Sequence, residues 1–147
     1  MDRKRVLFVC VHNSARSQMA EAFLKEMADD LFEVESAGFE PTALNPLAVE
    51  VMKEAGHDIS KKRATNVFQR FRNGELFDFV ISVCDQNKDQ RCPTFAGITK
   101  RIHWSFDDPA DFQGTWEEKL EQTRNVRDKI QARLKEWVAE FRKEGRP

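Results

Sequence analysis

The segment from Arg5 to Cys10, with the sequence RVLFVC, is the feature that most constrains the fold of this chain. It is apolar at every position after the first, which is typical of a strand covered on both faces inside a parallel sheet. From about Ser17 onward, the apolar residues change to the spacing of an amphipathic helix. Because parallel strands are joined by crossover connections that usually contain a helix, this order of strand, loop and helix predicts an α/β fold.

Three further segments have the pattern of strands. The segment 32–36 (FEVES) alternates, which favours a place nearer the sheet edge, and the other two are 77–83 (FDFVISV) and 101–104 (RIHW). We therefore predict a single α/β domain over residues 1–147, with a central, mostly parallel, four-stranded sheet flanked by helices.

Two further helices are indicated by local signals. Asn45 followed by Pro46 predicts a helix N-cap with proline at the first helical position. The last 30 or so residues carry an apolar stripe that begins at Trp116 and ends at Phe141, which predicts one long amphipathic helix. In such folds ligands bind beyond the carboxyl ends of the strands. Cys10, Cys84 and the loop after the fourth strand are all expected at that edge.

Composition narrows the class of protein. The chain has 24 basic and 25 acidic side chains and a formal net charge of −1, which gives no support for a nucleic-acid or membrane-surface partner. No apolar run approaches the length of a transmembrane helix, and the first ten residues lack a signal-peptide cleavage site, so we expect a cytoplasmic protein. The sequence shows no large apolar surface pattern, and we therefore expect a monomer. Three cysteines, Cys10, Cys84 and Cys92, argue against a secreted disulfide framework and against an all-cysteine zinc site.

The loop between the first strand and the helix has the composition of an oxyanion site. Five residues separate Cys10 from Arg16. Backbone N–H groups in such a loop can point inward, the helix dipole favours an anion there, and arginine can add a bidentate pair of hydrogen bonds. A thiolate beneath the anion is placed for in-line attack. The alternative is that Cys10 is only a buried strand-end thiol, but its spacing and flanking structure favour a nucleophile. The predicted anion-binding residues are Val11, His12, Asn13, Ser14, Ala15, Arg16 and Ser17.

The chain resembles the low-molecular-weight tyrosine phosphatases and, among them, the thioredoxin-coupled arsenate reductases. The similarity runs from about residue 6 to residue 111, and its strongest parts are CVHNSARSQMAEAF, NPLAVEVMKEAG, DIS, the segment with the second and third cysteines, and HWSFDDPA. The resemblance implies a phosphatase-like fold, arsenate as substrate with phosphate or sulfate as competitors, and reduced thioredoxin as the source of electrons, with no bound cofactor.

Three thiols are the number that a self-resolving reductase needs. Reduction of arsenate takes two electrons, which a dithiol supplies when it closes to a disulfide, and a third thiol can then move that disulfide outward. By resemblance, Cys10 attacks arsenate, Cys84 attacks Cys10, and Cys92 takes over the disulfide for thioredoxin. A phosphatase needs only the first thiol, because water completes its cycle.

The segment SFDDPADF supplies a carboxylate next to a proline. By resemblance, Asp108 is the general acid that protonates the departing oxygen, whereas Asp107 is expected to be a solvated neighbour. In the phosphatases tyrosines commonly follow this Asp-Pro pair. Here Ala110 follows it and the chain contains no tyrosine, which disfavours a phosphotyrosine site.

A potassium site is a further hypothesis from the resemblance. Some reductases of the family bind potassium through residues that match Asn13, Glu21 and Ser36, together with an aspartate at the position of Thr65 in this chain. Because the acid is replaced, we predict no metal ion and expect Glu21 to be an ordinary exposed helix residue. Asn13 and Ser17 are expected to hold the loop through side-chain to backbone hydrogen bonds.

Three functions stay open at this point. The first is a thioredoxin-dependent arsenate reductase. The second is a low-molecular-weight phosphatase that uses Cys10, Arg16 and Asp108 in the same roles. The third is a non-enzymatic module that binds oxyanions or senses redox state.

Overall fold

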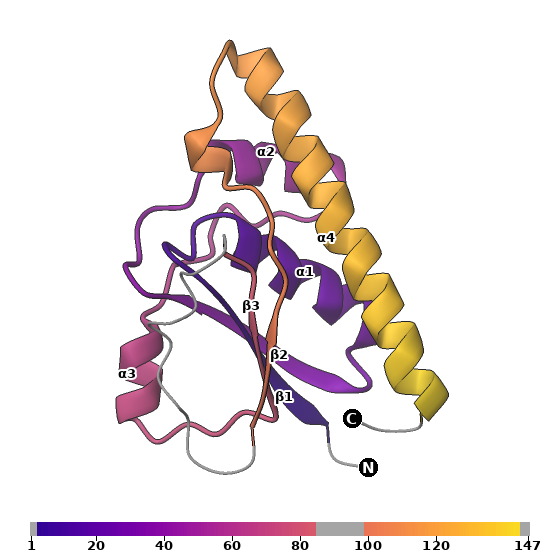
Figure 1. Ribbon diagram of the computed structural model, residues 1–147. Coiled ribbons are helices and arrows are strands. Elements are labelled where there is room, and N and C mark those ends of the chain that lie inside the picture. The colour runs from indigo at the N-terminus through magenta and orange to yellow at the C-terminus, as the bar shows by residue number, and fades with distance from the viewer. Residues whose placement is uncertain (1–2, 85–98, 145–147) are drawn as a thin grey trace.

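The computed structural model describes residues 3–84 and 99–144 (Figure 1). Within these residues, four parallel strands form one sheet in the order β2-β1-β3-β4, so the predicted mostly parallel sheet is confirmed and the described strands are all parallel. The strands are β1 (Lys4–Cys10), β2 (Phe32–Gly38), β3 (Phe79–Ser82) and β4 (Lys100–His103). The helices are α1 (Arg16–Ala28), α2 (Pro46–Glu54), α3 (Val67–Arg72), α4 (Trp116–Glu144) and the 3-10 turn η2 (Pro109–Asp111).

Strand β1 lies inside the sheet, as its unbroken apolar run predicts. Every residue from Val6 to Cys10 is buried, and the strand pairs with β2 on one side and β3 on the other. Strand β2 is an edge strand, and its alternation is real, because Val34 is buried while Glu33 is exposed. The two strand patterns therefore predicted the two positions in the sheet correctly.

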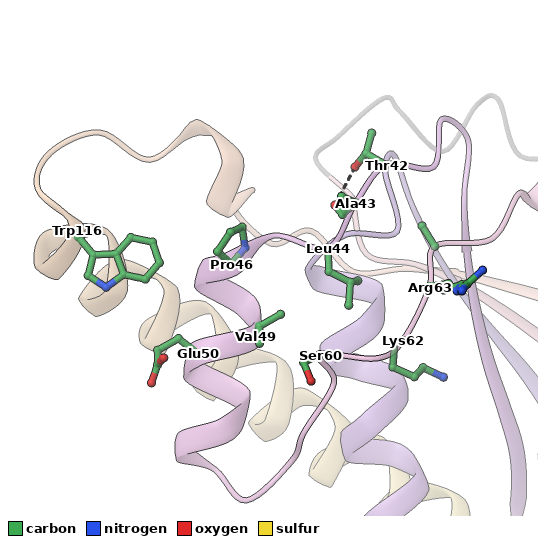
Figure 2. A pocket seen from close by; sticks show the side chains of 11 residues that line it. Thr42, Ala43, Leu44, Pro46, Val49, Glu50, Ser60, Lys62, Arg63 and Trp116 are labelled. Carbon is green, nitrogen blue, oxygen red and sulfur yellow. Dashed lines mark hydrogen bonds between the residues drawn. The ribbon is translucent and has the colours of Figure 1, made fainter.

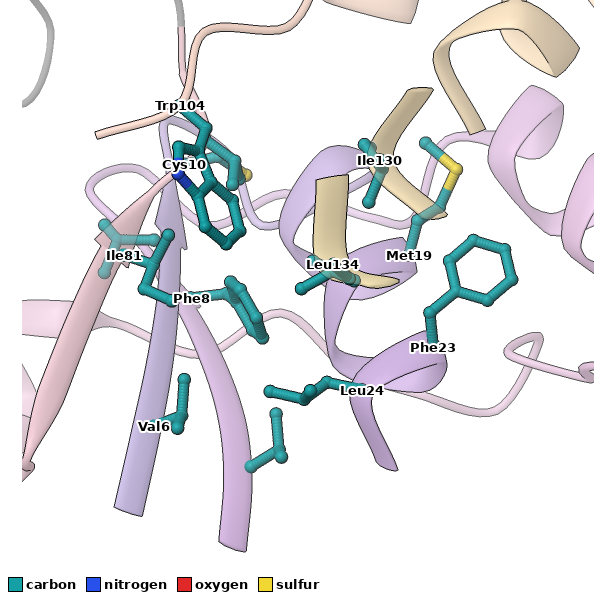
Figure 3. Close-up of a cluster of buried hydrophobic side chains, with 14 of the residues drawn as sticks. Val6, Phe8, Cys10, Met19, Phe23, Leu24, Ile81, Trp104, Ile130 and Leu134 are labelled. Atoms are coloured by element: carbon teal, nitrogen blue, oxygen red, sulfur yellow. The ribbon is translucent and has the colours of Figure 1, made fainter. Parts of the chain in front are cut away.

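Helices α1 and α4 pack against each other and cover one face of the sheet (Figure 1). Val6 and Phe8 lie on this face, where Figure 3 shows them beside the layer that contains Leu24 of α1 and Leu134 of α4. At the far end of the layer, aromatic rings of β2, β3 and α4 meet. The ring of Phe32 lies 5.1 Å from that of Trp137 and 6.5 Å from that of Phe79. Each fully buried ring contributes about 1.5–3 kcal/mol through the hydrophobic effect.

Helix α4 is a single helix of 29 residues with one buried stripe. Its N-terminus carries a capping box, since Glu118 N donates to Thr115 Oγ1 at 3.1 Å and Thr115 N donates to Glu118 Oε1 at 2.9 Å. The stripe consists of Leu120, Thr123, Val126, Ile130, Leu134, Val138 and Phe141. Trp116, which we expected in the stripe, is instead 49% exposed, because it is the first residue of the helix and extends beyond the packed layer.

Helix α2 begins at the predicted N-cap, whereas helix α3 was not predicted. Asn45 caps α2 by accepting a hydrogen bond from Leu47 N at 2.8 Å. Helix α3 spans only six residues after its cap Asn66, which is too short for an apolar period to be recognised. Among the described residues, no helix is long and apolar enough to cross a membrane.

Candidate active site

The predicted site residues that the structure describes lie at the carboxyl edge of the sheet. Cys10 ends β1, Cys84 follows β3 by two residues, and the loop with Asp108 follows β4. The register places Val9 opposite Ser82 in the neighbouring strand. The parallel topology thus brings together segments that are far apart in sequence, as the sequence pattern predicted.

The thiol of Cys10 sits in a network of hydrogen bonds inside the loop. Its sulfur lies 2.9 Å from Ser17 Oγ and accepts from Asn13 N at 3.2 Å. Asn13 Nδ2 in turn donates to Ser17 Oγ at 2.7 Å. The bond from Asn13 N makes the sulfur an acceptor, and the Ser17 hydroxyl can donate its own hydrogen to the same sulfur. Cys10 is therefore arranged as a hydrogen-bond acceptor, which suits a nucleophilic sulfur.

Asn13 holds the strained turn of the loop. Its φ of 53° lies in the left-handed region, which asparagine tolerates better than most residues. Its side-chain oxygen accepts from Thr65 N at 2.9 Å and from Gln18 Nε2 at 3.2 Å. The expected side-chain to backbone bond is confirmed for Asn13, whereas Ser17 is described with side-chain partners only. The turn is thus held by hydrogen bonds from Gln18 in α1 and from Thr65 in the segment after α2.

The carbonyls of the loop point away from the anion position. Val11 O accepts from Glu40 N at 2.7 Å, and Ser14 O accepts from Asn45 N at 2.9 Å. His12 O likewise accepts from the following segment, at 3.2 Å from Thr42 N. In a trans peptide the carbonyl and the next N–H point in opposite directions. The N–H groups of residues 12, 13 and 15 therefore face the inside of the loop, as an oxyanion site requires.

The start of α1 completes this arrangement. The helix begins at Arg16, and in the part of the chain that the structure describes no side chain caps it. A bound anion would satisfy the helix N-terminus. The ring of His12 contacts the segment after β2 rather than the thiol, with Nδ1 2.9 Å from Glu40 O. Its contribution to an anion is therefore its backbone.

Arg16 and Asp108 meet directly. Arg16 Nη2 lies 3.1 Å from Asp108 Oδ2, and Nη1 donates to Phe106 O at 2.9 Å. The arginine side chain is 3% exposed and the aspartate side chain 14%. Asp108 also caps η2, since its Oδ1 accepts from Ala110 N at 2.9 Å, whereas Asp107 is exposed, as expected. The guanidinium that would hold the anion is thus paired with the carboxylate proposed as general acid.

The other two cysteines differ in what the structure describes. Cys84 is fully buried, and its sulfur donates to Val9 O at 3.6 Å. Val9 is the residue directly before Cys10, so the two thiols belong to adjacent strand ends. Cys92 lies outside the described residues.

Three further residues shape the loop, and the sequence did not indicate this role for any of them. Gly38, at the end of β2, lies against the loop backbone, because a Cβ there would be 2.8 Å from Asn13 N and 2.9 Å from His12 C. Gln18 Nε2 donates to Asn13 O at 3.2 Å, and Thr65 supplies the N–H already described. Gly38 lies two residues beyond the predicted strand 32–36, in what the sequence indicated as a loop, so its place inside β2 and against the anion loop was not predicted.

The expectation for Glu21 was wrong. Its side chain is 5% exposed, because it points from α1 towards β2 and the segment after α2. Ser36 Oγ donates to Oε1 at 2.6 Å, while Lys25 Nζ and Lys62 Nζ lie 2.7 and 2.8 Å from Oε2. Burial raises the pKa of this carboxyl, but the hydrogen bonds from Lys25, Lys62 and Ser36 outweigh it, so the pKa lies below its ordinary value.

The residues of the potassium hypothesis do not fit a cation in this structure. Both oxygens of Glu21 are engaged by donors, and the Ser36 hydroxyl gives its hydrogen to this carboxylate. The side-chain oxygen of Asn13 accepts from Thr65 N and Gln18 Nε2. The negative charge that would attract a cation is already neutralised by two ammonium groups.

The surface pocket in Figure 2 is separate from the anion loop. It has a volume of about 710 Å³ and lies between residues 42–50 and 60–64, with Trp116 at one side. None of the predicted site residues lines it. The pocket therefore shares no lining residue with the predicted anion loop.

Comparison with known proteins gives a consistent set of similarities. The family model described as low molecular weight phosphotyrosine protein phosphatase matches residues 5–146. An arsenate reductase of Shouchella clausii is 44% identical over 138 residues, which are 94% of this chain and 97% of that relative. A solved structure of an arsenate reductase in the phosphate-binding state has a TM-score of 0.78 at 32% identity, over 93% of this chain and 98% of that one. A thioredoxin-dependent arsenate reductase of Corynebacterium glutamicum has a TM-score of 0.61 at 27% identity, over 90% of this chain and 62% of that one.

Proposed function

The chain belongs to the low molecular weight phosphotyrosine protein phosphatase family and, within it, to the arsenate reductases, and on this premise we propose that it reduces arsenate to arsenite through a relay of three thiols. The observation that carries the proposal is the Cys10 thiol beneath a loop of inward N–H groups, with a second thiol, Cys84, at the adjacent strand end. The relative whose structure is in a phosphate-binding state supports phosphate as a competitor of arsenate.

The first step forms a bond between sulfur and arsenic. The Cys10 thiolate attacks the arsenic atom, which Arg16 and the loop N–H groups hold in line. One arsenate oxygen leaves as water after Asp108 donates a proton to it. Asp108 must release Arg16 in this step, because the incoming oxyanion takes over the guanidinium.

The second step transfers two electrons to arsenic. The Cys84 thiolate attacks the sulfur of Cys10, and the electron pair of the S–As bond stays on arsenic. Arsenic(V) becomes arsenic(III), arsenite leaves, and a Cys10–Cys84 disulfide remains. Cys92 then attacks Cys84, which restores the Cys10 thiol and moves the disulfide outward.

Reduced thioredoxin closes the cycle by reducing the Cys84–Cys92 disulfide, so no bound cofactor is needed. The thioredoxin-dependent relative supports this choice of electron donor. A thiol relay of this kind works in a reducing compartment, and we place the protein in the cytoplasm.

The test is a coupled assay that follows NADPH oxidation with thioredoxin, thioredoxin reductase and arsenate. We expect NADPH to fall only when arsenate and intact Cys10 are both present, with Cys10→Ser as the matched control. A flat trace with thioredoxin, and also with glutaredoxin and glutathione, would contradict the reductase. Hydrolysis of p-nitrophenyl phosphate would then indicate a phosphatase, and its absence would leave an oxyanion-binding or redox-sensing module.

A second experiment separates the later thiols. Cys92→Ser is expected to release arsenite once per protein molecule but not to turn over repeatedly, because Cys10 stays in its disulfide. Unchanged steady-state turnover of this variant would remove Cys92 from the relay.

The family model also supports a phosphatase as a second candidate function. A Cys84→Ser, Cys92→Ser double variant distinguishes the two functions. Hydrolysis of p-nitrophenyl phosphate should survive in it if the protein is a phosphatase, whereas arsenate turnover should be lost if the protein is a reductase.

A further inference from the structure

The contacts of Glu21 suggest a function for a lysine outside the catalytic set. Glu21 is a buried carboxylate whose Oε2 carries two ammonium groups at nearly equal distances, 2.7 Å for Lys25 and 2.8 Å for Lys62. The two lysine side chains are also similarly exposed, at 47% and 42%. What distinguishes them is the segment of chain that each one anchors.

The described contact of Lys25 stays within its own helix. It stands four residues after Glu21 in α1, so their contact is an ordinary i,i+4 pair. Lys62 comes from the segment that follows α2 and crosses to α1 to reach Glu21. Of the two lysine contacts, the one from Lys62 therefore ties two distant parts of the chain together.

The segment that Lys62 anchors braces the anion loop. One residue further on, Arg63 O accepts from Gln18 Nε2 at 3.3 Å. Three residues on, Thr65 N donates to the side chain of Asn13 at 2.9 Å, and Thr65 O accepts from Gly38 N at 2.8 Å. These bonds hold the left-handed turn that directs Asn13 N at the sulfur of Cys10.

We propose that the Lys62 ammonium is a built-in cation that pairs with Glu21 and thereby positions the 62–65 segment and the anion loop, in place of a bound potassium ion. Lys62 is a positioning residue, since it acts on the loop through Thr65 and Asn13 and does not touch the anion. It follows that the protein does not depend on small monovalent cations, and that removal of the ammonium creates such a dependence. The inference rests on the proposed function only in taking the loop as an oxyanion site.

The test compares wild type with Lys62→Met, with Lys25→Met as the matched control and Lys62→Arg as the conservative variant. Each protein is measured in choline, potassium and ammonium chloride at equal ionic strength. The readouts are the melting temperature without any oxyanion and the affinity for inorganic phosphate by calorimetry. Neither readout requires arsenate turnover, so failure of the reductase proposal would not be confused with failure of this one.

We expect the wild type to give the same melting temperature and phosphate affinity in all three salts. In choline, Lys62→Met should bind phosphate about fivefold or more weakly than the wild type and melt at a lower temperature, because Glu21 lacks its second cation. Potassium or ammonium should bring its affinity back to within about twofold of the wild type. Lys62→Arg should behave as wild type, and Lys25→Met should change phosphate affinity by less than about twofold.

Three results would overturn the proposal. A wild type that is stabilised by potassium over choline would show that a cation binds although Lys62 is present. Equal phosphate affinities of Lys62→Met and Lys25→Met would show that the Lys62 contact does not brace the loop. If Lys62→Met had the same melting temperature and phosphate affinity in all three salts, the defect of this variant would not come from a missing cation.

Discussion

At the scale of single residues, the site is a set of groups that each fix the next. Asn13 donates from its backbone to Cys10 and from its side chain to Ser17, and Ser17 lies against the same sulfur. A change at any of these three residues therefore reaches the thiol within one or two hydrogen bonds. The contact between Arg16 and Asp108 is different in kind, because the anion must replace it.

Asp108→Asn should separate binding from turnover. The variant should lose arsenate turnover by about 10²- to 10⁴-fold, since no general acid remains. It should bind phosphate at least as tightly as the wild type, because no carboxylate competes for Arg16. The measurements are NADPH oxidation and calorimetric titration with phosphate, with the exposed Asp107→Asn as control. Phosphate affinity that fell tenfold or more would mean that Asp108 holds Arg16 in place rather than competing for it.

Gly38→Ala should damage the loop without touching the catalytic side chains. The added Cβ would lie 2.8–2.9 Å from the backbone of residues 11–13, and backbone cannot yield as a flexible side chain can. We expect a loss of about 1–3 kcal/mol in the free energy of unfolding, together with weaker phosphate binding. Urea unfolding with and without phosphate measures both. A variant with unchanged phosphate affinity would show that the loop can shift away from β2 at no cost to the site.

At the scale of elements, the two ends of the sheet have different roles. Its carboxyl edge holds the site, while near the other end β1, β2 and the chain around α3 are tied by ion pairs. Glu35 of β2 accepts from Arg5 of β1 and from Arg70 of α3. Burial raises the pKa of Glu35, but the hydrogen bonds and charges of these two arginines outweigh it, so its pKa lies below the ordinary value of 4.5.

This depressed pKa gives a pH dependence with a definite sign. A carboxyl whose pKa is lower in the folded state stabilises the fold above its unfolded pKa, and the stabilisation is lost as pH falls through the folded pKa. Glu35→Gln should therefore be less stable than the wild type at pH 7, by about 1 kcal/mol because the pair is partly exposed. The difference should shrink below about pH 4.5. Urea unfolding at several pH values measures it, with the more exposed Glu33→Gln as control. A difference that is constant down to pH 3 would rule out ionisation of Glu35 as its cause.

The same comparison of elements explains which features the sequence predicted. The strand, loop and helix around Cys10 are contiguous, so their spacing carried the prediction of both the fold and the anion loop. Gly38, Gln18 and Lys62 act through contacts with residues 5 to 45 positions away, which no local pattern encodes. Glu21 was expected to be exposed because the acid of the potassium site is replaced by Thr65, and its contacts with Ser36 and Lys62, which the sequence does not reveal, hold it inside.

At the scale of the whole molecule, the anion loop is where separate parts of the chain meet. The loop is held by the segment after β2, by the segment after α2 through Thr65, and by the segment after β4 through Arg16. An anion that orders the loop should therefore stabilise the entire cooperative unit, not only its own binding residues. Binding to the folded state alone raises the free energy of unfolding by about 2.7 kcal/mol at a ligand concentration of 100 times Kd.

This linkage predicts a change in melting temperature. Phosphate at about 100 times its Kd should raise the melting temperature by roughly 8 °C for a chain of this size, whereas sodium chloride at equal ionic strength should not. Arg16→Lys keeps the charge but cannot form the bidentate pair, so most of the increase should disappear in it. Scanning calorimetry measures both proteins. If Arg16→Lys were stabilised as strongly as the wild type, phosphate would be acting elsewhere on the molecule, and the loop would not be its site. If only the wild type responds, the stability of the whole fold reports occupancy of the loop.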